Sequence, residues 1–479
     1  MYDGFTPVAT LRSAWEDNNA LFAGVKGGYA QTSHSDLDIG TFIVAALGVE
    51  WSKELYPRIA SRAGFPSQSR MTRYMFYASS PQGNNTLIFN PGKMYPDMDL
   101  GQEVDTYASF DKFHADKNGA FAILNMSDAY RKYTSSVRRG IALVNNRREF
   151  LIQDEIVSDA RNLTYWFMHT DAEITVDGNT AILKERDKRL YMKILSPAKA
   201  EFEVMQAKAL PRTPTIADYD EDKFKNDYKL SIKTELTGNS QLAVWMVPLT
   251  KYDEIPATEP EVTSLDNWPL KEKDAAYLES VKLNGLELAD FKPEKLVYDI
   301  TTEEEDFNIE GFGKGVSVEK KVYNDAVILT VSAPNKNTVR YVFNKYVDFS
   351  SKVTFVASDV PQVANSPENT LDGDFSTRWA STGEQNIVYD LGETVIMDSI
   401  SVAFYQGDQR MYNFRIDLSE DGINYNTVFE DSHIAIATAD KIGMMTVGVF
   451  DKYNYGQDEI EKIATEYIND GETLRKLIV

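Results

Sequence analysis

The stretch HSDLDIG at residues 34–40 brings together side chains that can exchange protons or bind a cation. It holds His34, one of only four histidines in 479 residues, and two carboxylates, Asp36 and Asp38. An imidazole titrates near neutral pH, so it can act as a general base, a general acid or a metal ligand. On an extended strand the three side chains would share one face, because side chains alternate. The stretch predicts either a reactive site or a polar turn that caps the apolar segment after it.

A run of cationic residues follows this stretch in an otherwise acidic chain. The formal net charge is −23, which argues against non-specific nucleic-acid binding, since phosphate contacts need dense Lys and Arg. Between Trp51 and Arg73, one acidic residue, Glu54, stands among five cationic ones: Lys53, Arg58, Arg62, Arg70 and Arg73. A local patch of this sign can attract an acidic ligand despite the overall charge. We predict that Arg58 and Arg70 contact substrate, and the alternative is a set of solvated surface arginines.

The elements that would position these residues are expected to be strands. Hydrophobic residues make up 43% of the chain and charged residues 26%, which is typical of a globular protein. Short β-branched and aromatic runs alternate with Gly, Asn, Asp and Pro, which favours sheet. The apolar segment FIVAALGVEW after the first stretch fits either a buried strand or a short helix. The prediction is an all-β chain.

The pattern along the chain predicts several domains, because 479 residues exceed one compact core. We expect a large antiparallel β-sandwich at 1–250, in which VDGNTAIL forms a hairpin turn. The acidic segment 251–275, with three prolines, is predicted to be a linker. A small β-sandwich is expected at 276–346, a third β-rich unit at 347–450 and a helical tail at 451–479.

Targeting and membrane signals are missing from the sequence as given. The opening residues MYDGFTPVATLRSAW have no basic and apolar regions of a signal peptide, and no apolar run is long enough to span a membrane. No cysteine is present, so disulfides contribute nothing. Nothing in the sequence predicts an organic cofactor or a nucleic-acid partner.

Residues 5–250 resemble the sandwich domain of the heparinase II/III-type polysaccharide lyases. The family pattern is an Arg-Ser pair, a Gly-rich segment, a His-x-His-Leu-Asp-x-Gly-x-Phe motif, a Leu-Gly pair, a Trp and an Asn-Thr-Leu segment. The matching residues here are Arg12-Ser13, Gly27-Gly28, HSDLDIGTF from His34 to Phe42, Leu47-Gly48, Trp51 and Asn85-Thr86-Leu87. The resemblance implies β-elimination of uronate-containing glycans, a carbon–oxygen lyase reaction.

The resemblance also implies roles for individual residues. His34 occupies the position of a catalytic histidine. Independently of the resemblance, the nearby tyrosines Tyr29, Tyr74 and Tyr77 could line a cleft or pack half-buried in the sheet. We predict Tyr74 and Arg73 as further catalytic residues. Three positions correspond to zinc ligands of the family: Asp36, Glu54 and Asn84. Zinc prefers nitrogen and sulfur ligands, whereas this set offers oxygen only, so calcium suits it better. Zinc, a harder divalent ion and a metal-free polar cluster all stay open.

Residues 347–450 resemble the discoidin-like modules, also called coagulation factor V/VIII type C domains. The likeness is carried by Asp372-Gly373, Thr377-Arg378-Trp379, Asp390-Leu391-Gly392, Arg410 and Ser419. It implies a structural calcium on oxygens of Asp372, Asp374 and Thr377. We predict glycan contacts by Trp379 and Arg410, and the alternative for Trp379 is a place in the core of the module. Residues 276–346 resemble small Ig- or cadherin-like sandwich modules that act as spacers.

Together these resemblances imply an all-β lyase sandwich, a spacer and a discoidin-like jelly roll. In the lyase family a helical toroid precedes the sandwich and supplies further catalytic groups. We therefore expect the C-terminal portion of a polysaccharide lyase that acts on an acidic glycan and is inactive without a toroid domain, which a separate chain can supply. The alternative is a non-catalytic glycan-binding or cell-surface protein. Either implies a secreted or cell-envelope bacterial protein.

Overall fold

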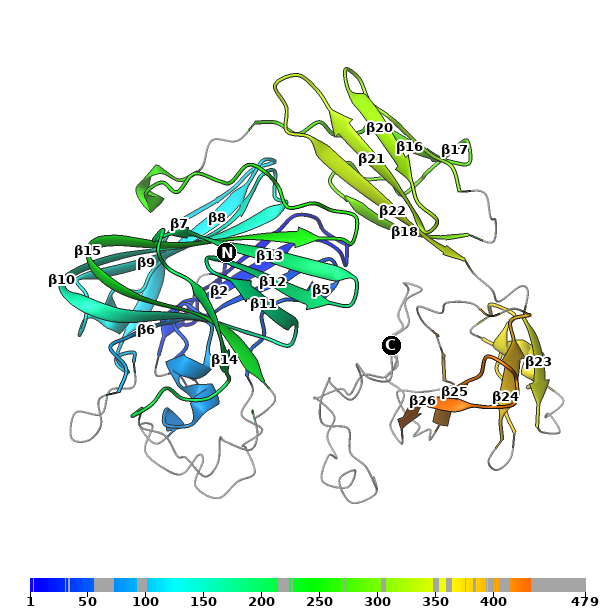
Figure 1. Ribbon diagram of the computed structural model, residues 1–479, viewed down its shortest axis with the longest axis horizontal. Helices are drawn as coiled ribbons and strands as arrows, with labels where there is room; N and C mark the ends of the chain where they lie inside the picture. The colour runs from blue at the N-terminus through cyan, green and yellow to red at the C-terminus, as the bar shows by residue number, and fades with distance from the viewer. Residues whose placement is uncertain are drawn as a thin grey trace. The chain divides into compact units, whose positions relative to one another are not determined.

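The computed structural model describes the chain outside residues 3, 31, 33–34, 56–72, 93–100, 214–223, 225–226, 270–272, 303–306, 348–352, 359–363, 375, 382–384, 393, 395–399, 401, 405–413 and 432–479. It forms two compact units (Figure 1). The first contains Met1–Ile300 with Asp306–Lys345, and the second contains Thr301–Glu305 with Tyr346–Val479. In the described ranges the regular elements are β-strands and short 3-10 turns, so the all-β prediction is confirmed.

The large sandwich of the first unit has two antiparallel sheets. The four-stranded sheet has the order β1-β2-β4-β5 and contains β1 (Val8–Arg12), β2 (Phe22–Lys26), β4 (Phe42–Ala46) and β5 (Val49–Glu50). The segment that fitted either a strand or a helix is therefore the strand β4. Phe42 of this sheet stacks on Trp166 of the larger sheet, with ring centres 5.4 Å apart, and both side chains are fully buried. The core lies between the sheets.

The larger sheet is eleven-stranded, with the order β11-β12-β13-β15-β10-β9-β8-β7-β3 and with β14 and β6 added to β15 and β10. Its strands are β3 (Gly28–Tyr29), β6 (Leu87–Phe89), β7 (Tyr107–Ala115), β8 (Ala120–Asn125), β9 (Ser136–Val144), β10 (Glu149–Thr170), β11 (Glu173–Asp177), β12 (Thr180–Glu185), β13 (Lys188–Ser196), β14 (Phe202–Gln206) and β15 (Tyr228–Leu249). The 3-10 turns η1 (Tyr77–Ser79), η2 (Pro81–Gly83) and η3 (Asp128–Tyr130) join them. β10 and β15 pair along their lengths, with one irregularity between Ser158 and Asn162.

The predicted hairpin in VDGNTAIL is present between β11 and β12. Gly178 takes a φ of +56° at the turn, a conformation that most side chains disfavour. A second tight turn joins β16 (Ser280–Leu283) and β17 (Leu286–Glu287), where Asn284 and Gly285 both have positive φ. This is the pattern of a two-residue hairpin loop that matches the twist of its strands.

The segment 251–275 runs over the outer face of the larger sheet. It contains η4 (Leu265–Asn267), and the side chain of Trp268 is only 2% exposed. The Trp268 ring contacts Phe121 edge to face with centres 5.6 Å apart, and Gln153 Nε2 donates to the carbonyl of Thr263 at 2.7 Å. The predicted linker thus packs on the sandwich.

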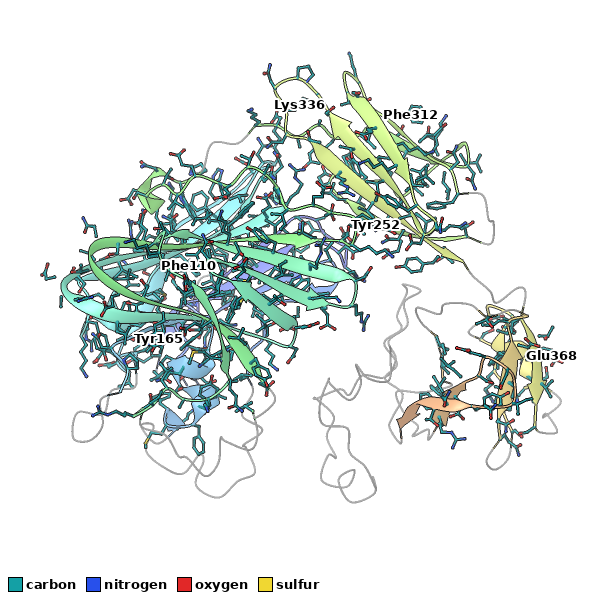
Figure 2. All side chains as sticks on the ribbon, viewed as in Figure 1. Phe110, Tyr165, Tyr252, Phe312, Lys336 and Glu368 are labelled. Carbon is teal, nitrogen blue, oxygen red and sulfur yellow. The ribbon has the colours of Figure 1, made fainter. Side chains whose placement is uncertain are left out.

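The small sandwich completes the first unit. Its sheets have the orders β17-β16-β19 and β18-β22-β21-β20. The strands are β16 (Ser280–Leu283), β17 (Leu286–Glu287), β18 (Val297–Thr302), β19 (Ile309–Phe312), β20 (Ser317–Val322), β21 (Ala326–Ser332) and β22 (Val339–Val347). Tyr252, labelled in Figure 2, donates to Asp325, and Arg340 Nη1 lies 2.8 Å from Asp253 Oδ1, so polar contacts join the two sandwiches.

The described part of the second unit contains two antiparallel strand pairs. β23 (Thr354–Ala357) pairs with β24 (Ile387–Asp390), and β25 (Phe414–Leu418) pairs with β26 (Asn426–Asp431). The turn η5 (Pro367–Thr370) precedes the loop that holds the predicted calcium ligands.

Candidate functional site

The segment 35–41 is a loop rather than the strand that would place its acidic side chains on one face. Leu37 N donates to the carbonyl of Ser79 at 3.0 Å, and Gly40 N donates to the carbonyl of Lys26 at 2.9 Å. Gly40 has a φ of +81°, which turns the chain into β4. Because these backbone bonds and this turn interrupt the extended conformation, the expectation of one shared strand face for Asp36 and Asp38 is wrong.

The loop nevertheless gathers charges from four segments. Asp38 forms an ion pair with Lys26 of β2. Arg73 Nη2 lies 3.1 Å from Asp36 Oδ1. The hydroxyl of Thr41 donates to Glu54 Oε1 at 2.8 Å. The cluster is a carboxylate-rich site in which the protein's own cations and a hydroxyl bind the acids.

The carboxyl group of Glu54 has a raised pKa in this cluster. Burial and, to a smaller extent, the nearby charge of Asp38 raise the pKa of Glu54 to about 7, against the hydrogen bond from Thr41. Burial likewise raises the pKa of Asp38, opposed by Lys26. A carboxyl group that titrates near neutral pH can accept or donate a proton under physiological conditions.

We expect Glu54→Gln to remove a pH dependence of stability. With a folded pKa of about 7 above the ordinary 4.5, the protonated carboxyl stabilises the fold below about pH 4.5, and this contribution is lost as pH rises through about 7. The difference in unfolding free energy between wild type and variant should change by roughly 3 kcal/mol over this interval. Urea unfolding at pH 4.5, 6 and 8 measures it. Glu203→Gln, at an exposed position on β14, is the control, and a difference for Glu54→Gln that stays constant with pH contradicts the prediction.

The predicted metal ligands do not fit zinc. Asp36 and Glu54 offer oxygen only, and Asp36 is held by Arg73. Asn84 Nδ2 donates to the carbonyls of Ser80 at 2.7 Å and Ala78 at 3.3 Å, which fixes its amide in the turn. Among the residues that the structure places, no group of three or more His, Cys, Asp and Glu side chains is arranged to hold a metal ion. A hard ion such as calcium on these oxygens stays a prediction.

The predicted catalytic and substrate-binding residues are only partly visible. His34, Arg58, Arg70 and Arg410 lie outside the described residues. Tyr74 is 2% exposed, and its hydroxyl donates to the carbonyl of Ala30 at 3.0 Å. Arg73 lies beside Tyr74 and pairs with Asp36. The structure therefore brings Arg73, Tyr74 and Asp36 to one place, and their catalytic roles stay predictions.

The described cations of the basic patch are neutralised within the fold. Lys53 forms ion pairs with both Asp171 and Asp227, which follow β10 and precede β15. Arg73 pairs with Asp36. These two cations are therefore less available to an acidic ligand than the sequence count indicates.

A buried polar chain next to the loop was not predicted from the sequence. Asn85 Oδ1 accepts from His169 N at 2.7 Å and lies 3.1 Å from His169 Nδ1, while His169 Nε2 lies 2.9 Å from the Tyr77 hydroxyl. Lys229 Nζ donates to that hydroxyl at 2.8 Å. Burial lowers the pKa of Lys229 and of His169 well below their ordinary values. A neutral His169 then donates through Nδ1 and accepts through Nε2, which satisfies both ring nitrogens.

A fully buried ion pair of the larger sheet supports the candidate site. Arg139 of β9 forms two parallel bonds to Asp154 of β10, Nε to Oδ1 at 2.7 Å and Nη2 to Oδ2 at 2.8 Å, and neither side chain is exposed. Arg139 Nη1 also donates to the carbonyls of Gly40 at 2.6 Å and Asn85 at 3.0 Å. Arg139 thereby ties the loop and the Asn85 segment to the larger sheet.

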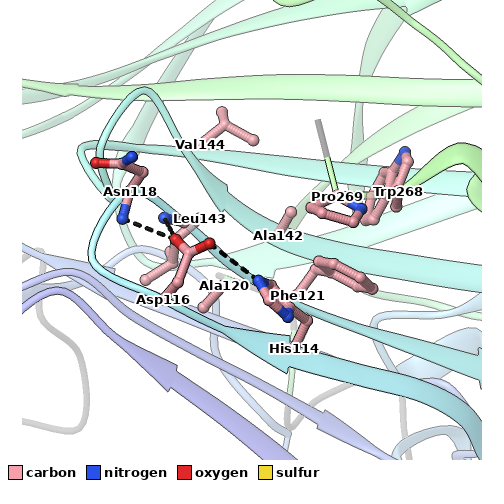
Figure 3. A pocket seen from close by; sticks show the side chains of 11 residues that line it. His114, Asp116, Asn118, Ala120, Phe121, Ala142, Leu143, Val144, Trp268 and Pro269 are labelled. Atoms are coloured by element: carbon pink, nitrogen blue, oxygen red, sulfur yellow. Dashed lines mark hydrogen bonds and ion pairs between the residues drawn. The ribbon is translucent and has the colours of Figure 1, made fainter. Parts of the chain in front are cut away.

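Figure 3 shows a hollow at another place in the first unit. It has a volume of about 120 Å³ and is lined by His114, Asp116, Phe121, Trp268 and neighbouring residues. His114 Nε2 lies 3.0 Å from Asp116 Oδ2. The hydrogen bond from His114 lowers the pKa of Asp116.

The predicted calcium ligands of the second unit share one turn. The Thr377 hydroxyl donates to Asp372 Oδ2 at 2.6 Å, and Asp374 N donates to Asp372 Oδ1 at 2.9 Å. Gly373 takes a φ of +72° between the two acids. Trp379 follows and is half-buried. The Thr377 hydroxyl thus contacts the Asp372 carboxylate, whereas Asp374 Oδ1 accepts from Ser376 N at 2.8 Å. A calcium ion on oxygens of Asp372, Asp374 and Thr377 stays a prediction.

The comparison with protein families identifies this second unit. Residues 354–468 match the F5/8 type C domain. The F5/8 type C match contains the turn at Asp372, the half-buried Trp379 and the four strands of the second unit. It extends beyond residue 450, into the segment for which the sequence predicts a helical tail. A comparison with curated proteins finds no match.

Solved structures similar to this chain include a heparan sulfate lyase and a heparinase III. The heparan sulfate lyase HepC from Pedobacter heparinus is 13% identical with a TM-score of 0.39, over 70% of this chain and 40% of that one. The heparinase III BT4657 gene product is 13% identical with a TM-score of 0.39, over 69% and 40%. A putative mutarotase (YeaD) from Salmonella typhimurium is 11% identical with a TM-score of 0.30, over 48% and 88%. The chain spans about two fifths of the length of these two enzymes. The comparisons thus find the same two families, the heparinases and the type C domains, that the sequence resembles.

Proposed function

We propose that this chain binds an acidic glycan and does not cleave it alone. The observation that carries the proposal is the F5/8 type C domain at 354–468, the module for which the sequence predicts glycan contacts. The lyase-type sandwich in the same chain supports an acidic, uronate-containing ligand. Such a ligand is found outside the cell, so a secreted or cell-envelope location goes with this proposal. No described helix is long and apolar enough to cross a membrane.

The contacts of the predicted catalytic residues support binding without cleavage. β-Elimination needs a base that removes the proton from C5 and an acid that protonates the oxygen leaving C4. The Tyr74 hydroxyl donates to a backbone carbonyl and is buried, so it is poorly placed to reach a substrate. A toroid domain of the kind found in the lyase family would supply a further acid or base.

One observation favours a second candidate, lyase activity of this chain itself. The pKa of Glu54, raised to about 7 by burial, lies in the range suited to general acid–base catalysis at neutral pH. In that case His34 would take the C5 proton, the C4–O bond would break with formation of a C4–C5 double bond, and an acid would return a proton to the leaving oxygen.

A single set of measurements separates the two candidates. The full chain is incubated with uronate polysaccharides, and the unsaturated product is followed by its ultraviolet absorbance, with and without EDTA, while binding is measured on a glycan array. We expect binding without product. Product that His34→Ala abolishes would establish the lyase candidate, and absence of binding to every acidic glycan would overturn the proposal.

A further inference from the structure

The loop between β1 and β2 leaves a large aromatic side chain in water. Trp15 is 76% exposed, although burying an indole is strongly favourable. Single exposed hydrophobic residues are common on protein surfaces, so exposure alone indicates no function. The neighbours of Trp15 make it different, because they hold the ring and place beside it a cation that has no carboxylate partner among the described residues.

An arginine lies against the ring. Arg12 Cζ is 5.3 Å from the centre of the Trp15 ring and 4.8 Å from the centre of the Phe22 ring. Arg12 and Phe22 stand opposite each other in the β1–β2 ladder, so the sheet fixes one half of this stack. Guanidinium groups are attracted to aromatic faces, which holds Arg12 and Trp15 together.

The loop that carries Trp15 has a defined shape. Ser13 N donates to the carbonyl of Leu21 at 3.0 Å, and Leu21 N donates to Ser13 Oγ at 2.9 Å, which closes the loop at its base. Leu47 N donates to the carbonyl of Asn19 at 3.0 Å. Glu16 has a φ of +55°, an uncommon conformation for this residue type. Local strain of this kind persists only where the surrounding structure holds it.

The N–H donors of the Arg12 guanidinium are not used by the described part of the protein. In the part of the chain with assigned positions, no carboxylate lies within ion-pair distance of it and no acceptor takes its N–H groups. The adjacent acid, Glu16, lies instead 3.4 Å from Lys292. An arginine without a carboxylate partner among the placed residues is notable in a chain with 73 acidic residues and 50 basic ones. Its planar fork of N–H groups matches a carboxylate or a sulfate.

We propose that Trp15 and Arg12 form a contact site for one acidic sugar residue. The pyranose ring lies on the free face of the indole, and its carboxylate or sulfate accepts hydrogen bonds from Arg12. The site rests on the proposed binding of acidic glycans and adds a contact outside the F5/8 type C domain and outside the loop at 35–41.

The test is 19F NMR of the full chain labelled with 5-fluorotryptophan. The resonance missing from the Trp15→Phe variant is that of Trp15. Three tetrasaccharides serve as probes: a heparan sulfate fragment with carboxylates and sulfates, a hyaluronan fragment with carboxylates only, and a neutral chitin fragment. Short probes limit repulsion by the net charge of −23.

We expect the Trp15 resonance to shift with an acidic probe and to stay in place with the neutral one. A shift with hyaluronan assigns the contact to the carboxylate, and a shift with heparan sulfate alone assigns it to the sulfate. Trp15→Ala should weaken binding of that probe about tenfold. Arg12→Gln should weaken it similarly and reduce its salt dependence.

The small sandwich offers a matched control. Lys282 Nζ lies 5.3 Å from the centre of the Phe312 ring, and Phe312, labelled in Figure 2, is 44% exposed. Lys282 has an acidic partner, Glu287, at 4.0 Å, so this pair lacks the free cation. Phe312→Ala should leave affinity unchanged.

Each remaining outcome overturns the inference in a recognisable way. A Trp15 resonance that stays in place while the chain binds an acidic probe overturns the site and leaves the proposed function standing. Equal shifts with neutral and acidic probes overturn the role of Arg12. No binding of any acidic probe overturns the site together with the proposed function.

Discussion

Replacing Arg139 by methionine is expected to lower the unfolding free energy of the first unit by about 3–5 kcal/mol. The variant leaves the Asp154 carboxylate fully buried without its cation and removes the donor to Gly40 and Asn85. Urea unfolding followed by tryptophan fluorescence measures the loss. The loop at 35–41 should become more exposed to hydrogen exchange, because Arg139 ties it to the sheet.

The double variant Arg139→Met with Asp154→Leu is the control for this prediction. Replacing both partners of a buried ion pair by apolar residues is often nearly neutral, because no charge stays unpaired. We expect more than half of the lost stability to return, with the remainder due to the two backbone carbonyls. A double variant as unstable as Arg139→Met would contradict the account.

Gly40→Ala is expected to cost about 2–5 kcal/mol of stability, from two sources. A side chain at a φ of +81° is disfavoured by about 1–2 kcal/mol. Its Cβ would also lie 2.1 Å from Met126 Sδ and 3.3 Å from Thr86 Oγ1, and such overpacking costs about 1–3 kcal/mol. Thermal and urea unfolding of the variant measure the sum.

Gly48→Ala separates the two sources. Gly48 has a similar φ of +72°, but the nearest atoms to its Cβ lie 3.9 Å away, an ordinary contact. We expect this variant to lose only the conformational part, about 1–2 kcal/mol. Equal losses at the two positions would show that the contact with Met126 relaxes without cost.

Local pattern in the sequence was enough to predict the strands and tight turns. The alternation of apolar and polar residues in β11 and β12 and the Gly-Asn pair between them specify a hairpin through neighbours alone. Asn284-Gly285 does the same in the small sandwich. These features depend on residues within a few positions of one another.

The candidate site was only partly predictable, because its partners come from distant segments. Lys53 pairs with acids 118 and 174 positions away, which converts a predicted basic patch into internal ion pairs. Asn85 contacts His169 across 84 positions. The alternation of Asp36 and Asp38 suggested a strand, whereas backbone bonds to remote residues made a loop. The composition of the chain and the spacing of its residues do not predict contacts between segments so far apart in the sequence.

The segment that crosses the outer face of the larger sheet has a consequence for where this protein can be divided. Leu265 and Trp268 cover apolar side chains that include Leu151 and Trp245, and they occupy the space above Gly140, where a Cβ would lie 2.4 Å from Leu265. A fragment cut at residue 250 would expose this apolar face to water, and exposed patches of this kind promote aggregation. The soluble boundary of the large sandwich therefore lies beyond Pro269, so a truncation series should begin there.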